Sequence, residues 1–360
     1  MNTETTKIKS LLKTLSRIHS SLNIEEVLEN SLREIVNLIG SETGSIWEID
    51  EKKQELFFRS IIGTAAPVLK NKRLKIGEGI AGMVAATGKS LIINDVKKSK
   101  QWKEEFDRES DFKTKNLLNF PLTSGEKVIG VIQLLNKKEG FTNQDLRLLS
   151  ILGAPISIAL ENAKLYTRIK KIFKETSLSL ATAIEKRDPY TGGHTKRVLT
   201  YSSIIGKSLG LADAELEQLE LSAILHDIGK IGIPDAILRK KELLNEEERK
   251  IIEKHPLIGA EIVMEIEGME KILGGIKYHH ERCNGSGYPE GLSCNKIPLF
   301  AKIIAVADVF DALTTERPYK KAMSFEEALI YLWEKKGTEF WPPAIKALKE
   351  ELNSQVLQYI

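Results

Sequence analysis

The chain has 360 residues, which is long for one domain and natural for two, each large enough to bury its own core. Hydrophobic residues make up 42% of the sequence, as in an ordinary globular protein, and the formal net charge is only +3. Because both signs of charge are mixed along the chain, the composition argues against a surface that binds nucleic acid polymers.

Nothing in the sequence indicates export or a membrane span. Residues 1–20 lack the apolar core of a signal peptide, and no later stretch reaches the ~18 unbroken apolar residues of a membrane helix. The two cysteines, Cys283 and Cys294, match no zinc-binding spacing and no disulfide framework, so reduced thiols are expected. We therefore expect a soluble, cytoplasmic protein with no membrane contact of its own.

Residues 1–165 predict an α+β domain in which an antiparallel sheet carries helices on one side. Apolar residues at helical spacing indicate helices near residues 8–18 and 24–38. The runs of β-forming residues are 45–49, 55–58, 90–93, 116–122 and 127–136. The first two runs pair naturally as a hairpin, and Gly125 supplies the turn between the last two.

Three segments of this half resemble a GAF domain. They are IGEGIAGMVAATGKSLIINDV (76–96), NFPLTSGEKVIGVIQLLNKK (119–138) and FTNQDLRLLSILGAPISIALENAKLY (141–166). The resemblance covers nearly all of residues 1–165. It implies a domain that senses a small molecule or only dimerises, and both interpretations stay open.

One motif bears on the ligand of such a domain. The pattern N-K-x(n)-F-x3-D-E of some GAF domains is matched by Asn136, Lys137, Phe141 and Asp145, with Leu146 in place of the final Glu. This departure argues against cyclic-nucleotide binding. The lack of cysteine in this half also argues against a thioether-linked bilin, so the small-molecule ligand stays unknown.

A helix is predicted to connect the two halves through a linker, residues 166–180. Apolar positions step by three and four along it, at Leu149, Leu152, Ile156, Ala159, Ala163 and Tyr166. This seam favours a parallel pair of helices in a homodimer that carries a signal to the second domain. The alternative is an ordinary helix packed on its own domain. Pro155 is expected to kink or start the helix.

Residues 181–360 predict an all-α domain organised around the segment LSAILHDIGKIGIPDAIL (221–238). An apolar helical run ends there on His226 and Asp227, two adjacent metal-competent side chains. Adjacent residues on a helix point about 100° apart, so each can face a different ion. Gly229 lets the chain turn away, and Lys230 sets a cation where a phosphate would lie.

The candidate metal ligands cluster in this half, since the chain has six histidines and all but His19 lie between 194 and 280. Most of the candidates lie at or near a predicted helix end. They are Glu185, His194, His226, Asp227, His255, His279, His280 and Asp308. Because one such ion takes about four to six ligands and a hydrolytic site keeps positions open for water, this set implies roughly two or three ions. Imidazole with carboxylate suits iron, manganese or zinc better than magnesium or calcium.

Four segments resemble the HD-GYP family, a branch of the HD superfamily of metal phosphohydrolases. They are HDIGKIGIPDAIL (226–238), KHPLIGAEI (254–262), HHERCNGSGYPEGL (279–292) and IPLFAKIIAVADVFDALTTERPYK (297–320). The resemblance covers about residues 175–345. It implies a helical bundle that hydrolyses cyclic di-GMP to pGpG and often GMP, with iron favoured as the metal, then manganese, then zinc.

The resemblance also implies a role for each matching residue in the reaction. Asp227 bridges two ions, and the other candidate ligands complete the set. Some family members have a carboxylate at the position of Glu185 and hold a third ion, whereas others lack it and hold two. Lys230 lies over the scissile phosphate and adds electrostatic stabilisation.

Further matching residues are expected to bind substrate. Arg317 and Lys320 match positions that grip substrate phosphate. Asp311 either binds guanine or orients the helix that carries Asp308. Four loop residues shape the segment around the GYP triplet, namely Gly285, Gly287, Tyr288 and Pro289.

The expected reaction is attack of a metal-bridged hydroxide on phosphorus, in line with the leaving 3′ oxygen. Three alternatives remain: a slow or non-catalytic cyclic di-GMP receptor, a hydrolase of another cyclic dinucleotide, and a redox enzyme with mixed-valent iron. The cationic set of Lys230, Arg317 and Lys320 favours phosphate chemistry over redox chemistry.

Overall fold

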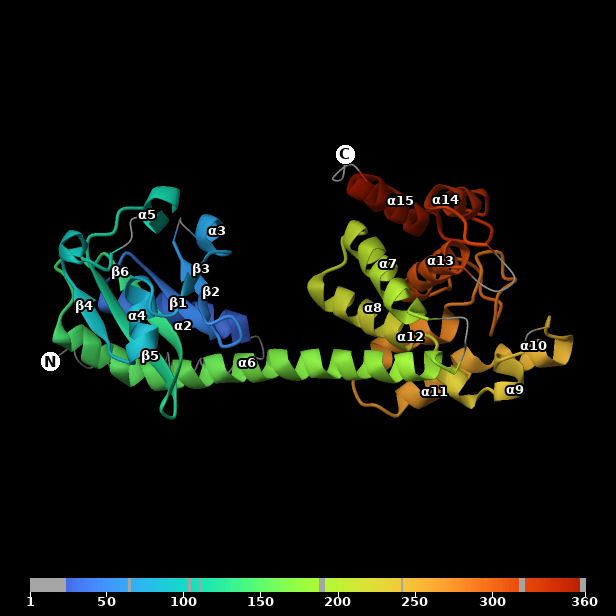
Figure 1. Cartoon of the computed structure of the whole chain (residues 1–360), viewed down its shortest axis with the longest axis horizontal. Helices are drawn as coiled ribbons and strands as arrows, with labels where there is room; N and C mark the ends of the chain where they lie inside the picture. Colours follow the sequence, from blue (N-terminus) through green and yellow to red (C-terminus); the bar gives the residue numbers. More distant parts are fainter. Residues whose placement is uncertain are drawn as a thin grey trace. The chain divides into compact units, whose positions relative to one another are not determined.

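The structure is a computed structural model that describes residues 24–63, 66–102, 105–110, 112–187, 192–240, 242–316 and 321–356. The helix expected near residues 8–18 lies outside this part of the chain. The chain divides into two compact units, Met1–Lys170 and Lys171–Ile360 (Figure 1). One long helix, α6 (Asn143–Glu185), runs through the whole predicted linker. The α+β fold class predicted from the sequence is confirmed, with an antiparallel sheet in the first unit and helices in the second.

The first unit is built on a six-stranded antiparallel sheet with the order β3-β2-β1-β6-β5-β4. Its strands are β1 (Thr43–Asp50), β2 (Glu55–Ile62), β3 (Arg73–Lys75), β4 (Leu91–Ile93), β5 (Leu117–Ser124) and β6 (Lys127–Leu135). Both predicted hairpins are confirmed, and Gly125 has a φ of 58° at the β5–β6 turn. Strand β3 was not predicted because two of its three residues, Arg73 and Lys75, are charged, and charged residues do not mark a strand.

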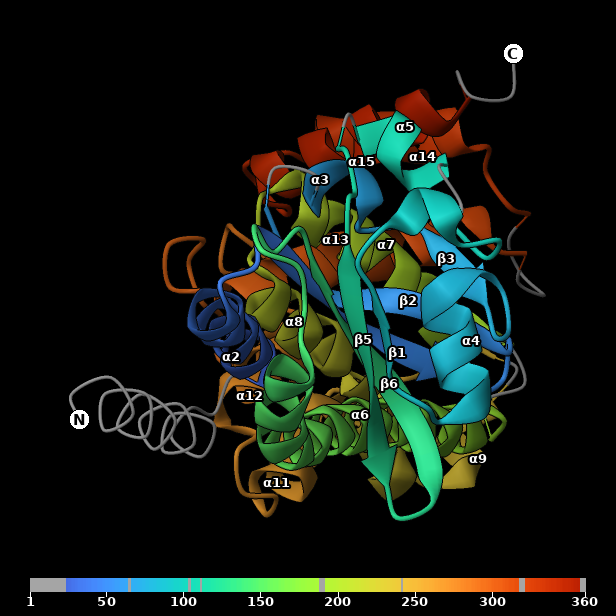
Figure 2. The ribbon, with the colours of Figure 1, turned by 90° about the vertical axis from the view of Figure 1, so that its left-hand side faces the viewer.

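Helices cover both faces of this sheet, so the expectation of helices on one side was wrong (Figure 2). On one face, α2 (Ile24–Ile39) and α6 pack Leu32 and Ile156 against Ile132 of β6. On the other face, α4 (Gly79–Thr87) packs Val84 against Trp47 of β1. Three short helices complete the described part of the unit: α3 (Ala66–Leu69), η1 (Val96–Lys98) and α5 (Glu105–Ser110).

The predicted dimer seam on α6 instead forms the core of the first unit. Five of its six residues are buried there, namely Leu149, Leu152, Ile156, Ala159 and Ala163. Only Tyr166 is exposed. The same spacing of three and four serves a helix that packs on its own sheet, which explains the error. Pro155 also lies inside α6 and does not start it.

By length and composition alone, α6 is the one helix of the described residues that would suit a membrane span. However, 44% of its most apolar window is buried within the protein. The buried apolar residues of α6 between Leu149 and Ala163 pack on strands β1, β5 and β6 of the sheet. Its apolar character is therefore accounted for in large part by the protein core.

The second unit is helical, and its described residues contain no strand beyond two isolated bridges. Its main helices are α7 (His194–Ser208), α8 (Asp213–Leu225), α10 (Glu246–Ile252), α11 (His255–Met264), α12 (Glu270–Tyr278), α13 (Leu299–Thr314), α14 (Phe325–Glu334) and α15 (Pro342–Val356). Two short helices, η2 (Ile228–Gly232) and α9 (Asp235–Leu238), follow α8. The core around Phe310 of α13 takes residues from α7, α8, α14 and α15.

In this unit His255 opens α11, where Pro256 occupies the first turn, a position at which proline loses no helical hydrogen bond. One local expectation for the unit was wrong. Cys283 and Cys294 are not reduced thiols, because the structure joins them in a disulfide. Sequence spacing could not reveal that pair, since pairing depends on how the intervening loop folds back.

The N-K-F-D motif of the first unit has a structural explanation. The Lys137 ammonium lies 2.6 Å from Oδ1 of Asp145. The other oxygen, Oδ2, accepts from the backbone N–H and the hydroxyl of Thr142. Phe141 is buried in the core between them. The motif therefore ties the end of β6 to the start of α6. Burial alone would raise the pKa of Asp145, but Lys137 and Thr142 outweigh it and lower that pKa.

We expect Asp145→Asn to lower the free energy of unfolding of the first unit by about 1.5–3 kcal/mol, because a charged hydrogen-bond acceptor is lost. Calorimetry of the full chain measures the change, with the exposed Glu126→Gln as control. Since the folded pKa is depressed, the wild-type advantage is present at neutral pH and fades as the pH falls below about 3.9. A melting profile equal to that of the control would contradict this assignment.

Candidate metal centre

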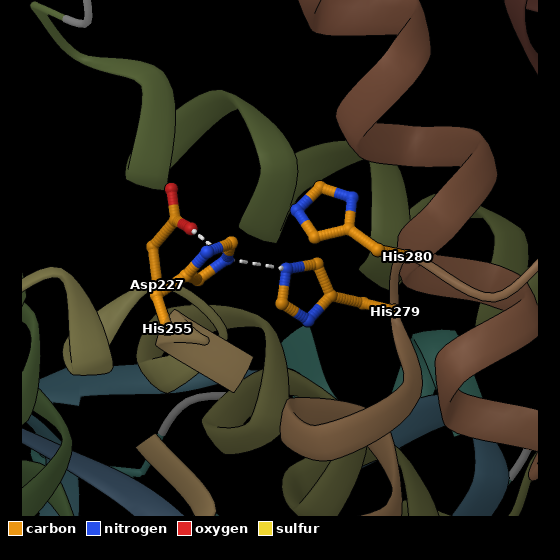
Figure 3. A group of neighbouring side chains, drawn as sticks. All are labelled: Asp227, His255, His279 and His280. Carbon is orange, nitrogen blue, oxygen red and sulfur yellow. Dashed lines mark hydrogen bonds and ion pairs between the residues drawn. The ribbon is translucent and has the colours of Figure 1, made fainter. Parts of the chain in front are cut away.

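Seven of the eight predicted ligands meet in two groups of donor atoms. The first group is Asp227, His255, His279 and His280, and the second is His194, His226 and Asp308. Within each group, the donor atoms lie within 4.8 Å of one another. The first group is shown in Figure 3, where the rings of His255 and His279 turn their nitrogens toward each other.

Helix ends bring these side chains together. His194 and His255 are the first residues of α7 and α11, and His226 and His279 directly follow α8 and α12. Asp308 alone reaches in from the middle of a helix, α13. A bundle can converge helix ends on one cavity without interrupting any helix, so the predicted placement is confirmed.

Gly229 is required here by close packing. A Cβ atom at this position would lie 1.9 Å from the carbonyl oxygen of His255 and 2.4 Å from the amide nitrogen of Gly259. Its φ is not in the left-handed region, so the turn itself does not demand glycine. Gly229 therefore lets η2 press against α11, which places His255 beside Asp227.

The protonation of the imidazoles follows from their backbone partners. The Nδ1 atoms of His226, His255 and His279 each lie 2.7 Å from a main-chain carbonyl oxygen three residues earlier. A carbonyl only accepts, so each Nδ1 carries the proton and each Nε2 presents a lone pair.

The Nε2 atoms face one another in two pairs. Those of His194 and His226 are 3.3 Å apart, and those of His255 and His279 are 3.4 Å apart. Two unprotonated Nε2 atoms at this distance repel each other, and a cation bound near both removes the repulsion. The donor set of each group therefore fits a metal cation, which imidazole and carboxylate bind in proteins.

Asp227 lies between the two groups. Its Oδ1 is 3.2 Å from His255 Nε2, while its Oδ2 is 3.5 Å from His226 Nε2. The Lys230 ammonium lies 2.7 Å from that Oδ2. Burial would raise the pKa of Asp227, but Lys230 and the neighbouring imidazoles outweigh it and hold this pKa well below its usual range. Asp227 is therefore an anion with one oxygen toward each group.

Burial has the opposite effect on three histidines. It lowers the pKa of His226, and it lowers those of His279 and His280 well below their usual range, with neighbouring histidines adding to the effect. These rings are therefore neutral at physiological pH. Neutral imidazole is the form that binds metal, so no proton has to be displaced from them.

Asp311 lies behind the second group. Its Oδ2 is 2.8 Å from His194 Nδ1, and both its oxygens accept from the guanidinium of Arg197. Burial would lower the pKa of His194, but Asp311, Asp308 and Asp227 outweigh it and raise this pKa. Asp311 is 1% exposed, so a guanine contact does not fit its position. It holds the ring of His194, as outer carboxylates do for metal-binding histidines.

Glu185 is not part of either donor group, contrary to the prediction. Its Oε1 accepts from the backbone N–H of His194, and its Oε2 accepts from the N–H and hydroxyl of Thr195. The first residues of a helix leave such N–H groups unpaired, and a carboxylate there is favoured by the helix dipole. Glu185 thus caps α7 from a distance, because the adjoining Gly193 has no side chain to do so.

The GYP loop covers the first group. The Tyr288 ring lies 4.7 Å from the ring of His280, and the loop residues Gly285 and Gly287 make close backbone approaches. A Cβ atom at Gly287 would lie 2.4 Å from the amide nitrogen of Arg282. The disulfide between Cys283 and Cys294 closes this loop, which includes Pro289.

Two residues that support the site were not predicted. Glu281 is 2% exposed and accepts from the N–H groups of Glu290 and Leu292, so it holds the GYP loop together. Arg197 orients Asp311. The sequence signal that could have revealed Glu281 is an acid directly after the histidine pair. For Arg197, the signal is a cation one helical turn after His194. Arg317 and Lys320 lie outside the described residues.

Comparison with known proteins agrees with this geometry. Residues 21–161 match the family model of the GAF domain, and residues 179–343 match that of the HD domain. The cyclic di-GMP phosphodiesterase response regulator RpfG of Xanthomonas campestris is 43% identical over 177 residues, covering 49% of this chain and 47% of the relative.

Two further relatives align with a similar share of the chain. The 3′3′-cGAMP-specific phosphodiesterase 3 of Vibrio cholerae is 38% identical and covers 47% of this chain and 37% of the relative. A cyclic di-GMP phosphodiesterase of Thermotoga maritima is 41% identical and covers 45% of each. The chain therefore spans less than half the length of these curated relatives.

The second unit is thus an HD domain, the class of helical domain that the two donor groups define. More particularly, the chain is an HD-domain protein with an N-terminal GAF domain, as the motifs predicted.

The position of Glu185 yields a test. We expect Glu185→Gln to leave the metal content per chain unchanged and to lower the free energy of unfolding by about 0.5–2 kcal/mol, the usual cost of losing a helix cap. Metal analysis and calorimetry give the two readouts, with the exposed Glu261→Gln as control. Loss of one ion per chain would instead make Glu185 a ligand.

Proposed function

We propose that this protein is a metal-dependent phosphodiesterase that hydrolyses cyclic di-GMP to pGpG or GMP. The observation that carries the proposal is the two pairs of facing Nε2 atoms with the Asp227 carboxylate between them. Two donor groups that share one anion suit a pair of cations. Such a pair supplies an activated water and neutralises charge on a phosphodiester.

The residues of the chain would have distinct tasks. The first group would hold one ion and the second group the other, with Asp227 shared between them. Lys230 would turn from Asp227 to the phosphate and stabilise charge that develops in the transition state. Arg317 and Lys320 would bind the outer phosphate, where a guanidinium fits two oxygens at once.

We propose two ions per chain, with iron favoured over manganese and zinc. We do not propose a third ion, because both oxygens of Glu185 accept hydrogen bonds from the first residues of α7. A second substrate, 3′3′-cGAMP, is favoured by one observation: a relative named for that substrate is 38% identical over 170 residues. Both substrates share the 3′–5′ phosphodiester on which this site would act.

The test starts from anaerobic purification and metal analysis of the full chain. Turnover of cyclic di-GMP and 3′3′-cGAMP is then followed by chromatography. We expect about two ions per chain and the appearance of pGpG or GMP. Bound metal without cleavage of either dinucleotide, across iron, manganese and zinc, would overturn the proposal in favour of a receptor.

Asp227→Ala provides the residue-level test. Removal of a residue that only hydrogen-bonds to a metal ligand typically lowers activity about 10- to 100-fold. We expect Asp227→Ala to lower turnover by more than this, because it removes the anion that the two ions would share. Metal content is expected to fall as well. The exposed Asp213→Asn serves as control, and retained turnover in Asp227→Ala would contradict the assignment.

We propose that the GAF domain binds a small regulatory molecule in a cavity lined by residues of β1, β2 and β6. Aromatic residues line it, namely Trp47, Phe58, Trp102 and Phe112, together with the polar Gln133. Next to Gln133 in the sheet, the buried amide of Asn119 finds no partner among the described residues. A flat, largely apolar molecule with an amide-like edge would fit such a lining.

We also propose that the chain is a homodimer, but through a different stripe of α6 from the predicted seam. Ile151, Ile158 and Leu165 recur at heptad spacing on this helix and are 59%, 53% and 49% exposed. Ile169 extends the stripe and is 64% exposed. A heptad repeat is the pattern with which a helix pairs with a copy of itself.

We expect Ile158→Glu to convert a dimer into a monomer, because an unpaired carboxylate in an apolar interface is costly. Sedimentation equilibrium of the full chain measures the mass. Val68→Glu, at a residue of similar exposure on α3, is expected to leave the dimer intact. A monomeric wild type, or a dimer unaffected by Ile158→Glu, would exclude this stripe as the interface.

A further inference from the structure

Arg187 lies in the turn directly after α6 and holds a segment that follows the His226–Asp227 pair. One guanidinium nitrogen, Nη1, donates to the carbonyl oxygens of Lys230 and Ile231 at 3.3 and 3.0 Å. The other, Nη2, donates to the carbonyl oxygen of Ile233 at 3.1 Å. These carbonyls lie at or directly after the end of η2, and that of Lys230 also accepts from the N–H of Ile233.

The same side chain also anchors the start of α9. Its Nε and Nη2 lie 3.2 and 2.8 Å from Oδ1 of Asp235, the first residue of that helix. In return, the carbonyl oxygen of Arg187 accepts from the Nε of Arg239. All three guanidinium nitrogens are therefore engaged, in a planar fork that a lysine cannot reproduce.

The segment held in this way carries Lys230. Its ammonium lies 2.7 Å from Asp227, and its backbone carbonyl is one of those that Arg187 contacts. Gly229 presses the same segment against α11. Arg187 and α11 together thus determine where the backbone of residues 228–235 lies, and with it the direction in which Lys230 leaves the chain.

We propose that Arg187 is a positioning residue that acts on the reaction through Lys230, an inference that rests on the proposed phosphodiesterase function. Glu185, at the last position of α6, holds the start of α7 and the backbone of His194. The end of α6 therefore supports both donor groups at once, one through Glu185 and the other through Arg187. A shift of this helix end would therefore displace the backbone of His194 and the segment that carries Lys230, which makes it a point through which regulation could reach the site.

The first test needs no substrate. Hydrogen exchange of the full chain is compared between wild type, Arg187→Lys and Lys186→Gln, the last removing a neighbouring exposed charge. We expect faster exchange of the amides of residues 230–238 in Arg187→Lys only, because the fork to three carbonyls is lost. Asp235→Asn, which removes the carboxylate partner, should change the same peptides in the same direction. Unchanged exchange in both variants would overturn the proposal.

The second test asks whether Arg187 acts through Lys230. We expect Arg187→Lys to lower kcat about 10- to 100-fold, as misplacement by about 1 Å does, with little change in KM and in metal content. In a Lys230→Met background, the Arg187→Lys change should cost almost nothing further. Losses that multiply in the double variant would overturn the proposal. A wild type that cleaves nothing would refute the proposed function, while hydrogen exchange would still decide the role of Arg187.

Discussion

Four imidazole rings of the HD domain turn their Nε2 lone pairs toward one another in two pairs, and the rest of the site follows from this constraint. Main-chain carbonyls and the Asp311 carboxylate fix the protons on the Nδ1 side, so the rings cannot relieve the repulsion by exchanging tautomers. Burial also disfavours protonation of His226 and His279, whose pKa values are lowered. A cation bound between the rings would satisfy these nitrogens without protonation of His226 or His279.

Lys230 and Asp227 show how the chain arranges charge around this constraint. Asp227 sends one oxygen toward each group, and the Lys230 ammonium balances that anion from the open side. An ammonium on a flexible stem can move to a phosphate oxygen when a different cation neutralises the carboxylate. The contact seen between Lys230 and Asp227 is thus consistent with a cation that changes its partner during the reaction.

Most of the ligand set could be predicted because metal-binding residue types stand close together in short, recognisable segments. His226 and Asp227 stand side by side, and the pattern of residues 279–289 combines a histidine pair with a glycine-rich turn. Sequence could not predict Glu185 as a helix cap, because its partners lie beyond a loop whose path decides the contact. Arg187 was missed for the same reason, since its carbonyl partners have no sequence signature.

The fold shows the same division between local and long-range information. Periodicity located β5 and β6 closely, because each strand pairs with its neighbour in the sequence. It could not decide which surface the apolar positions of α6 cover, since a core-facing stripe and a dimer seam share the same spacing. Leu149, Leu152 and Ile156 pack in the core, so Ile151 and Ile158 lie on the exposed face of the helix.

This use of α6 has a consequence for regulation. Its apolar residues pack on the GAF sheet early in the helix, whereas its last residue, Glu185, caps α7 in the HD domain. A continuous helix transmits a rotation or a shift along its length because each turn is hydrogen-bonded to the next. Glu185 and Arg187 then convert such a movement into a displacement of both His194 and Lys230. Under the proposed function, both donor groups would act on one phosphodiester, so a movement of this helix end that displaced His194 relative to Lys230 would change turnover.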